Sequence, residues 1–187
     1  MLAYPHSLTP VQTLTADARR DVSEVSEGWV GKYQGRGAGH GKFVSAHGEV
    51  YEGQWRDGIR HGDGKMALAD GSMYVGQFAE GEYHWHGRLM WPTGGIFDGE
   101  YVAGKRQGEG FNRWADGKEY QGQWYAHKEH GRGRMQYSDG AVYVGEFVER
   151  KCCGRGRKVD ANGVLVFDGE WEDGKPVAGG GQVSYWV

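Results

Sequence analysis

Histidine pairs are the first place to look for chemistry in this chain. His84 and His86 are two residues apart, so on an extended strand both imidazoles could point to one side and share a metal ion. A structural zinc site requires four ligands, and neither a cysteine nor a third histidine is paired with these two in the sequence. We therefore predict no metal site at this pair.

Catalytic side chains and phosphate-binding loops are also not indicated. His61 and His130 recur at one position of a repeating pattern, which favours a polar role in a turn, because general acid–base catalysis needs a second titrating group held in a pocket. Cys152 and Cys153 are adjacent and lack a C-x-x-C motif, so we interpret them as substitutions within the pattern. The glycines at 35–39 and 179–181 lack the Lys-Ser/Thr ending of a phosphate loop. We expect no cofactor and no enzymatic activity.

Charge and hydropathy limit the classes of partner. The 22 basic and 25 acidic residues give a net charge of −3, which argues against general binding of nucleic acid. No run approaches the ~18 apolar residues of a membrane span, and two adjacent cysteines cannot form a long-range disulfide within one chain, which suits a reducing compartment. We expect a soluble protein of the cytoplasm.

A local cluster of basic residues is the candidate site for an anion. Five cations occur within nine residues, with no acid among them, and either an anionic phosphoinositide headgroup or an acidic partner would suit this charge. A solvated charged face is the alternative. The five residues are Arg150, Lys151, Arg155, Arg157 and Lys158.

Three aromatic residues are candidates for binding a partner. Trp85 occupies a position where neighbouring copies of the pattern have glycine, so it is either an anchor for a protein partner or a ring that fills a gap among buried aromatics. Tyr185 and Trp186 belong to the final apolar stretch, which is typical of an edge strand. Such an edge pairs with a partner, with a second copy or with the N-terminal segment.

These residues lie within a repeat of the form aromatic-x-Gly-x-aromatic, which starts at residues 29, 51, 74, 97, 120, 143 and 167. Residues two apart share one face of a strand, and the Asp-Gly pairs between copies are typical of hairpin turns. Each copy therefore predicts one β-hairpin, and the rings of successive hairpins predict a structural aromatic ladder. Its members are Trp29, Tyr33, Tyr51, Trp55, Tyr74, Phe78, Phe97, Tyr101, Tyr120, Trp124, Tyr143, Phe147, Phe167 and Trp171.

The predicted fold is all-β, an elongated single-layer antiparallel β-meander solenoid of about seven hairpin repeats over residues 29–187. Residues 1–28 carry no repeat. Residues 15–20 favour a short helix, and Leu8, Val11 and Leu14 add apolar character. This segment is either a cap on the first hairpin or an arm that binds a partner.

The pattern Tyr51-Glu-Gly-Gln-Trp55 followed by His61-Gly-Asp-Gly and Asp70-Gly71 resembles the MORN (membrane occupation and recognition nexus) repeat. MORN arrays are binding modules in ciliary radial-spoke heads, parasite cytoskeletal structures, junctional membrane proteins and accessory regions of some enzymes. The resemblance implies a non-catalytic scaffold that joins proteins of a large assembly, in the cytoskeleton or the axoneme of a cilium or flagellum. The alternatives are a membrane-surface adaptor for phosphoinositides and an accessory subunit of a mitochondrial complex.

Overall fold

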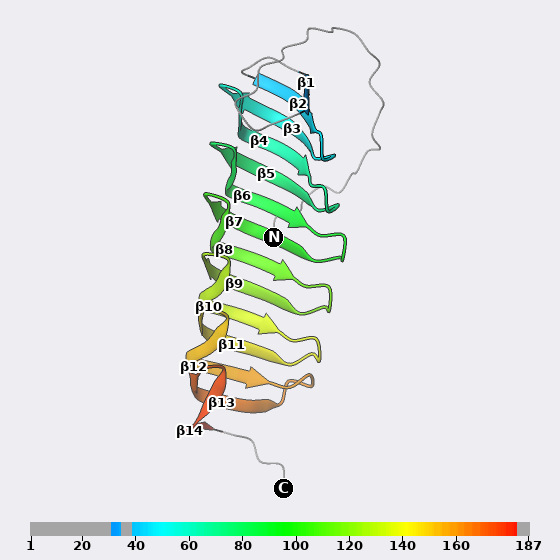
Figure 1. Ribbon diagram of the computed structural model, residues 1–187. Helices are drawn as coiled ribbons and strands as arrows, with labels where there is room; N and C mark the ends of the chain where they lie inside the picture. The colour runs from blue at the N-terminus through cyan, green and yellow to red at the C-terminus, as the bar shows by residue number, and fades with distance from the viewer. Residues whose placement is uncertain (1–30, 35–38, 183–187) are drawn as a thin grey trace, which may run out of the picture.

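The computed structural model describes residues 31–34 and 39–182, which form one antiparallel sheet of fourteen strands (Figure 1). Each strand pairs only with its neighbours in the sequence, so the sheet is a meander and the predicted all-β fold is confirmed. No helix that could cross a membrane occurs among these residues. The strands are β1 (Gly31–Gln34), β2 (Gly39–Ser45), β3 (Val50–Arg56), β4 (Ile59–Ala67), β5 (Met73–Ala79), β6 (Glu82–Met90), β7 (Ile96–Val102), β8 (Lys105–Arg113), β9 (Glu119–Tyr125), β10 (Lys128–Gln136), β11 (Val142–Val148), β12 (Lys151–Val159), β13 (Leu165–Glu172) and β14 (Lys175–Gln182).

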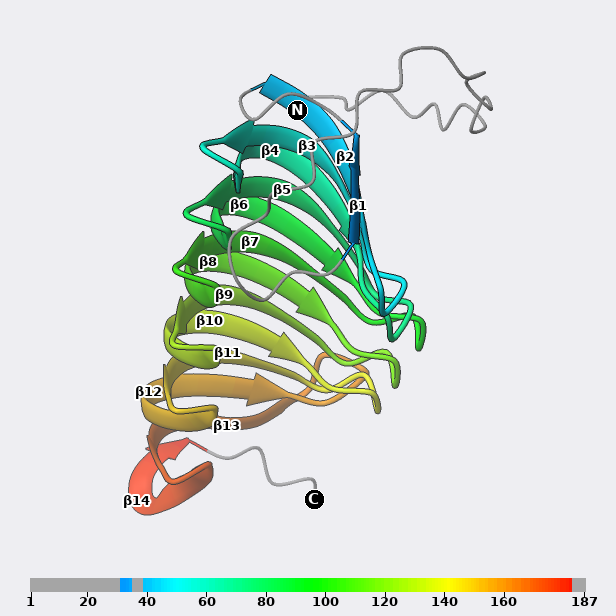
Figure 2. The same ribbon diagram turned by 45° about the horizontal axis from the view of Figure 1, so that its top comes forward.

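The two faces of the sheet differ in composition. In β3, Tyr51 and Trp55 are buried on one side, while Glu52 and Gln54 alternate with them and are exposed on the other. We call the side of Tyr51 the ring face and the side of Glu52 the outer face. The strands curve and twist together along the stack, as Figure 2 shows. A single layer is thus stabilised on one side only.

The ring face carries a continuous chain of aromatic contacts. Twelve of the fourteen predicted ladder rings lie in the described part with their side chains, and each is at most 9% exposed. Within a repeat the rings meet edge to face, as Tyr74 and Phe78 do at 5.1 Å between centroids. Between repeats they do the same, as Tyr51 and Phe78 do at 5.0 Å. Trp29 and the side chain of Tyr33 lie outside the described residues.

Paired glycines make room for these rings. Gly76 in β5 and Gly87 in β6 are register partners, and the ring of Tyr74 lies across them. A Cβ on Gly76 would lie 2.5 Å from the Cα of Gly87, and a Cβ on Gly87 would lie 2.1 Å from the Tyr74 hydroxyl. That hydroxyl reaches past the pair and donates to the carbonyl of Gln77 at 2.9 Å. The glycine in each aromatic-x-Gly-x-aromatic copy is therefore a steric requirement of the ladder.

Buried indoles join successive hairpins. The Nε1 of Trp55 donates to the carbonyl of Gly41 at 3.1 Å, and the Nε1 of Trp171 donates to that of Gly156 at 2.8 Å. Both bonds run from one hairpin to the preceding one. Each bond gives the buried indole N–H an acceptor that it would otherwise lack. Buried tryptophans usually have such a partner.

We predict that Gly76→Ala destabilises the protein by about 3 kcal/mol, because the new Cβ overlaps backbone that cannot move without separating two strands. Gly94→Ala is the matched control. Gly94 has a φ of +91° and open space around it, so its substitution costs only about 1 kcal/mol of backbone strain. Urea unfolding of both variants measures the difference, and equal losses would contradict this account of the glycine pairs.

We also predict a loss of stability at alkaline pH. Burial raises the pKa of Tyr51 to about 12, and burial raises the pKa of Tyr74, Tyr120 and Tyr143 further still. Because the folded pKa exceeds the unfolded value of about 10, the folded state keeps its full advantage below pH ~10 and loses it as the pH rises toward the folded values. Urea midpoints measured from about pH 8 to about pH 12 should fall with phenolate absorbance appearing at unfolding. A constant midpoint would show that these rings are not buried.

Candidate interaction site

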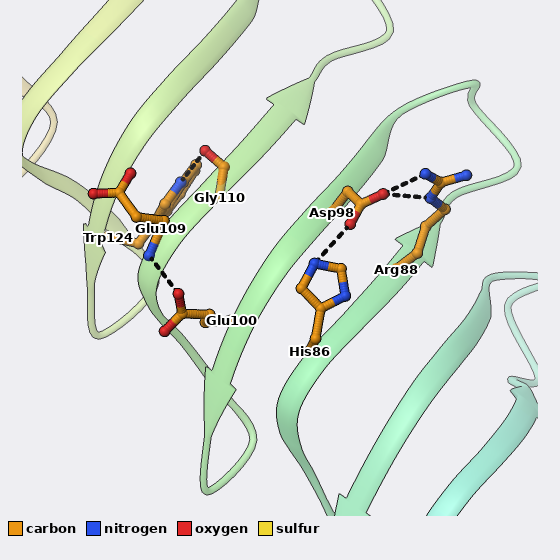
Figure 3. Close-up of polar contacts among 7 residues, drawn as sticks. All are labelled: His86, Arg88, Asp98, Glu100, Glu109, Gly110 and Trp124. Atoms are coloured by element: carbon orange, nitrogen blue, oxygen red, sulfur yellow. Dashed lines mark hydrogen bonds and ion pairs between the residues drawn. The ribbon is translucent and has the colours of Figure 1, made fainter. Parts of the chain in front are cut away.

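A bulge in the second strand of each hairpin from β3 to β14 defines the site. Gly62, Gly108, Gly131 and Gly154 occupy this bulge with φ between 55° and 68°. The preceding strand covers the bulge with an amide or carboxylate. The Oε1 of Gln54 accepts the N–H of Asp63 at 3.0 Å, and the Oε1 of Glu100 accepts that of Glu109 at 3.4 Å (Figure 3). We call this arrangement the bulge clamp.

Trp85 occupies the same bulge in the third repeat with a φ of +51°, a conformation that bulky side chains rarely adopt. Its side chain is 50% exposed, and its ring contacts His84 at 4.6 Å between centroids. No bulge clamp forms here among the described residues, since Gln77 makes no bond to the N–H of His86. The sequence leaves two interpretations of Trp85 open, an anchor for a protein partner or a buried ring that fills a gap. The exposure of its ring is not that of a buried gap-filling residue.

The ring that fills the core beside this bulge belongs to Tyr83. It stacks on Tyr74 at 3.7 Å between centroids and with 9° between the planes. It also meets Tyr101 edge to face at 5.7 Å. Sequence reasoning missed Tyr83, because the residue lies outside the aromatic-x-Gly-x-aromatic motif at a position where other repeats have Arg60, Arg106, Glu129 or Cys152.

A polar cluster follows Trp85 on the outer face. The Nε2 of His86 lies 3.2 Å from Oδ1 of Asp98, and Arg88 donates to Oδ2 of the same carboxylate through its Nε at 2.7 Å and through its second terminal nitrogen (Figure 3). His84 is engaged separately, with its Nδ1 accepting the N–H of Ala103 at 3.3 Å. The site is thus an exposed indole in contact with His84, followed along β6 by an imidazole and a guanidinium that are both bonded to the carboxylate of Asp98.

No group of three or more potential metal ligands occurs in the part of the chain that the structure describes. The cysteine thiols are not placed for thiolate chemistry either. Burial raises the pKa of both Cys152 and Cys153, and the sulfur of Cys152 lies 3.8 Å from the Tyr137 hydroxyl. A raised pKa keeps a thiol protonated and weakly nucleophilic.

The five basic residues predicted as an anion site do not converge on one surface. Arg150 and Lys151 lie at a hairpin turn, where Arg150 is 3.7 Å from the buried Glu129 and Lys151 is 2.9 Å from Asp173. Lys158 is turned to the ring face, with its Nζ 4.8 Å from the centroid of the Tyr137 ring. The remaining two face the opposite way, on the outer face, where acidic residues are their register partners: Arg155 opposite Glu170 and Arg157 opposite Asp168.

A family model described as the MORN repeat matches residues 51–73, 74–96, 97–119, 120–142, 143–164 and 167–177, which is more than half of the chain. The chain belongs to the MORN-repeat family. The MORN repeat is a non-catalytic repeat type, and arrays of it indicate a scaffold for protein interaction or membrane binding. The hairpin of β1 and β2 precedes the matched residues and pairs in a different register, because Gly31 lies opposite Ser45 whereas Gly53 lies opposite Gly64.

No curated protein matches this MORN chain in sequence. Among solved structures it is similar to the TCP domain of SAS-4 (dCPAP) of Drosophila melanogaster in complex with a proline-rich motif of Ana2 (dSTIL). The identity is 13%, the TM-score is 0.36, and the match covers 81% of this chain and 96% of that one. It is also similar to the TCP10 domain of CPAP from Danio rerio in complex with a peptide of STIL, at 16% identity and a TM-score of 0.21, covering 75% and 99% of the two chains. Likenesses this low support no statement about function.

A second polar group, on the ring face of the MORN array, was not predicted. The guanidinium of Arg106 lies over the rings of Phe97 and Trp124, at 5.2 and 4.7 Å from their centroids, and donates to the Oδ1 of Asn112 at 3.2 Å. Glu129 follows one repeat later and is only 4% exposed. The available signal was weak. It consists of charged residues at a position that recurs every 23 residues next to the ring ladder.

Tyr185, Trp186 and residues 1–28 lie outside the described residues, so their predicted roles stay predictions.

We predict that Trp85→Gly stabilises the protein by about 1 kcal/mol. Relief of a left-handed backbone strain of about 1–2 kcal/mol exceeds the entropy that glycine adds to the unfolded chain, and Gln77 becomes free to form the bulge clamp. Thermal unfolding measures the change, which corresponds to a rise of about 2–4 °C in Tm for a chain of this size. A lower Tm would show that the indole contributes to packing.

Proposed function

We propose that this MORN-repeat protein is a non-catalytic structural scaffold that binds protein partners within a large assembly, through the outer-face surface centred on Trp85. The observation that carries the proposal is the placement of Trp85. A large aromatic ring stands half exposed at a bulge that five other repeats occupy with glycine. Strained residues that persist without a packing benefit are concentrated at functional sites.

The chemistry of the site suits a protein surface as the ligand. Tryptophan and arginine are enriched among residues that dominate the energy of protein interfaces, and such anchors are bordered by polar groups that exclude water. Trp85 supplies the anchor, and the bonded set of His86, Arg88 and Asp98 supplies a polar border that is already organised. An organised border lowers the entropy lost on binding.

The setting that the family resemblance supports is the cytoplasm and cytoskeleton, with the axoneme of a cilium or flagellum and its radial spokes as the specific proposal. An accessory role in a mitochondrial complex is an alternative within the same structural class. A membrane adaptor for phosphoinositides is less well supported, because the predicted cations are divided between two faces and a turn and four of the five have an acidic residue in contact or opposite.

The test is a comparison of native assemblies that contain tagged wild-type protein or the Trp85→Gly variant, by cross-linking mass spectrometry. A hot-spot tryptophan contributes at least about 2 kcal/mol to binding, so recovery of direct partners should fall by about 30-fold or more in the variant. Because the variant is expected to be at least as stable as the wild type, the loss cannot be ascribed to unfolding.

Tyr125→Ser is the matched control, since Tyr125 is 60% exposed, has no strained backbone and is the last residue of β9 in another repeat. It should leave partner recovery unchanged. Equal recovery from the wild type and Trp85→Gly would refute the site. Recovery with anionic lipid in place of cross-linked proteins would refute the protein scaffold in favour of the membrane adaptor.

A further inference from the structure

An unbroken apolar row crosses six strands of the outer face. From β2 to β7 each member is the register partner of the next, and the row lies on the side of the sheet opposite the aromatic ladder. Each member is partly or largely open to solvent, and Val44 is 38% exposed. The members are Val44, Val50, Ala67, Met73, Met90 and Ile96. Apolar residues on the solvent side of a single-layer sheet indicate that another element covers them.

A second row, rich in cations, runs beside the first. Two residues before the apolar positions of β2, β4 and β6 lie Lys42, Lys65 and Arg88, all exposed. Register partners within this row are Glu52, Val75 and Asp98, so cations outnumber acids three to two. The occupant of the apolar row should therefore carry acids along one flank.

The chain itself brings a segment to this place. Strand β1 begins at Gly31, which is the register partner of Ser45, the residue next to Val44. The residues that precede Gly31 thus enter the sheet at the end of the apolar row. They amount to 30 residues, which lie outside the described part of the structure.

The sequence of residues 10–27 has the features of an amphipathic helix. Thr9 and Pro10 are suited to the N-cap and first helical positions, and Gly28 is suited to the C-terminal cap. At about 100° per residue, five apolar residues fall within about 40° of the centre of one face. They are Val11, Leu14, Ala18, Val22 and Val25.

The charges of this segment are sorted in the same way. On the same wheel Asp17, Asp21 and Glu24 lie together on one flank of the apolar face, and Arg19 lies on the other. The segment from 10 to 27 has four acids and two arginines. Its acidic flank complements the row that contains Lys42 and Lys65.

We propose that residues 10–27 form a helix that docks on the outer face across β2 to β7, with its apolar face on the row from Val44 to Ile96 and its acidic flank over Lys42 and Lys65. The lengths agree. Eighteen helical residues span about 27 Å, and six strands span about 24 Å. In this position Val25 lies over Val44, and the small Ala18 lies over the small Ala67.

The handedness of the two elements is consistent with this arrangement. The helix must run with its C-terminal end toward β1, because Gly28 to Val30 join it to Gly31. The N–H of Ser45 donates to the carbonyl of Glu49, on the side of β3. Because N–H groups alternate in direction along a strand, the outer-face residues of β2 direct their N–H groups the other way, toward β1. In L-residues this N–H direction determines on which side of the apolar row Lys42, Lys65 and Arg88 lie. A right-handed helix that runs toward β1 with its apolar face on the sheet has its acidic flank on that same side, and not on the side of the opposite turns.

Zero-length carbodiimide cross-linking of the full chain tests the proposal, with a mixture of ¹⁴N and ¹⁵N protein to separate links within one chain from links between chains. The expected products are Glu24–Lys42 and Asp17–Lys65 within one chain. The pair Lys128 and Glu149, whose Nζ and Oε1 are 3.0 Å apart, reports that the reaction works. Leu14→Asp combined with Val22→Asp should lower the yield of both products at least tenfold, while Ala16→Asp on the opposite side of the helix leaves it unchanged.

Three results would overturn the proposal. One is the absence of both products in a sample where Lys128 and Glu149 are linked. Another is their appearance only between heavy and light chains, which would make a second copy the occupant. The third is an equal yield from the doubly substituted chain, which would show that apolar docking is not what brings the acids to the lysines. None of these results depends on whether Trp85 binds a partner.

Discussion

An aromatic ring lying across a pair of glycines is the contact on which the rest of this structure depends. Each hairpin places such a ring over two backbones that approach too closely for a Cβ. Each ring then meets the next one edge to face, within the repeat and between repeats. Edge-to-face pairs add about 0.5–1.5 kcal/mol to the stabilisation from burial, so the ladder stabilises the ring face of a single layer without a second sheet packed on it.

This construction separates stability from binding. Because the ladder lies on the ring face, the outer-face positions and the bulges vary without loss of the core, and contacts reach only from one repeat to its neighbours. Trp85 is an example of this variation. Its ring is exposed and takes no part in the ladder, while the ring of Tyr83 fills the core beside the bulge. The same separation allows an apolar row on the outer face to serve as a docking surface, since no ladder residue takes part in it.

Much of the fold follows from the sequence, because the ladder is a local pattern with a fixed period. Aromatic residues two apart around a glycine, repeated seven times, define strand, face and hairpin together. The bulges did not follow, since they arise where two strands pair and no local motif marks them: Gln54 covers the bulge before Asp63, nine residues away, while the bulge at Trp85 forms without a clamp. The five-cation cluster does not form one surface because strand alternation sends Arg155 and Lys158, three residues apart, to opposite faces, and Arg150 and Lys151 lie at a turn. Whether Trp85 is exposed could likewise not be predicted from the sequence, because it depends on the backbone conformation at the bulge.

The most direct test of the central claim is amide hydrogen exchange in the native state of two variants, Tyr120→Ala and Gln121→Ala. Tyr120 contacts the rings of Trp124 and Phe147, whereas the neighbouring Gln121 faces outward and is exposed. If the ladder holds the sheet, loss of the Tyr120 ring speeds exchange in the strands around it, from β8 to β12. Exchange in β3 and β4 stays slow, and Gln121→Ala matches the wild type. Equal effects of the two substitutions, or acceleration spread evenly over all strands after loss of the ring, would contradict a sheet stabilised by ring contacts between neighbouring repeats.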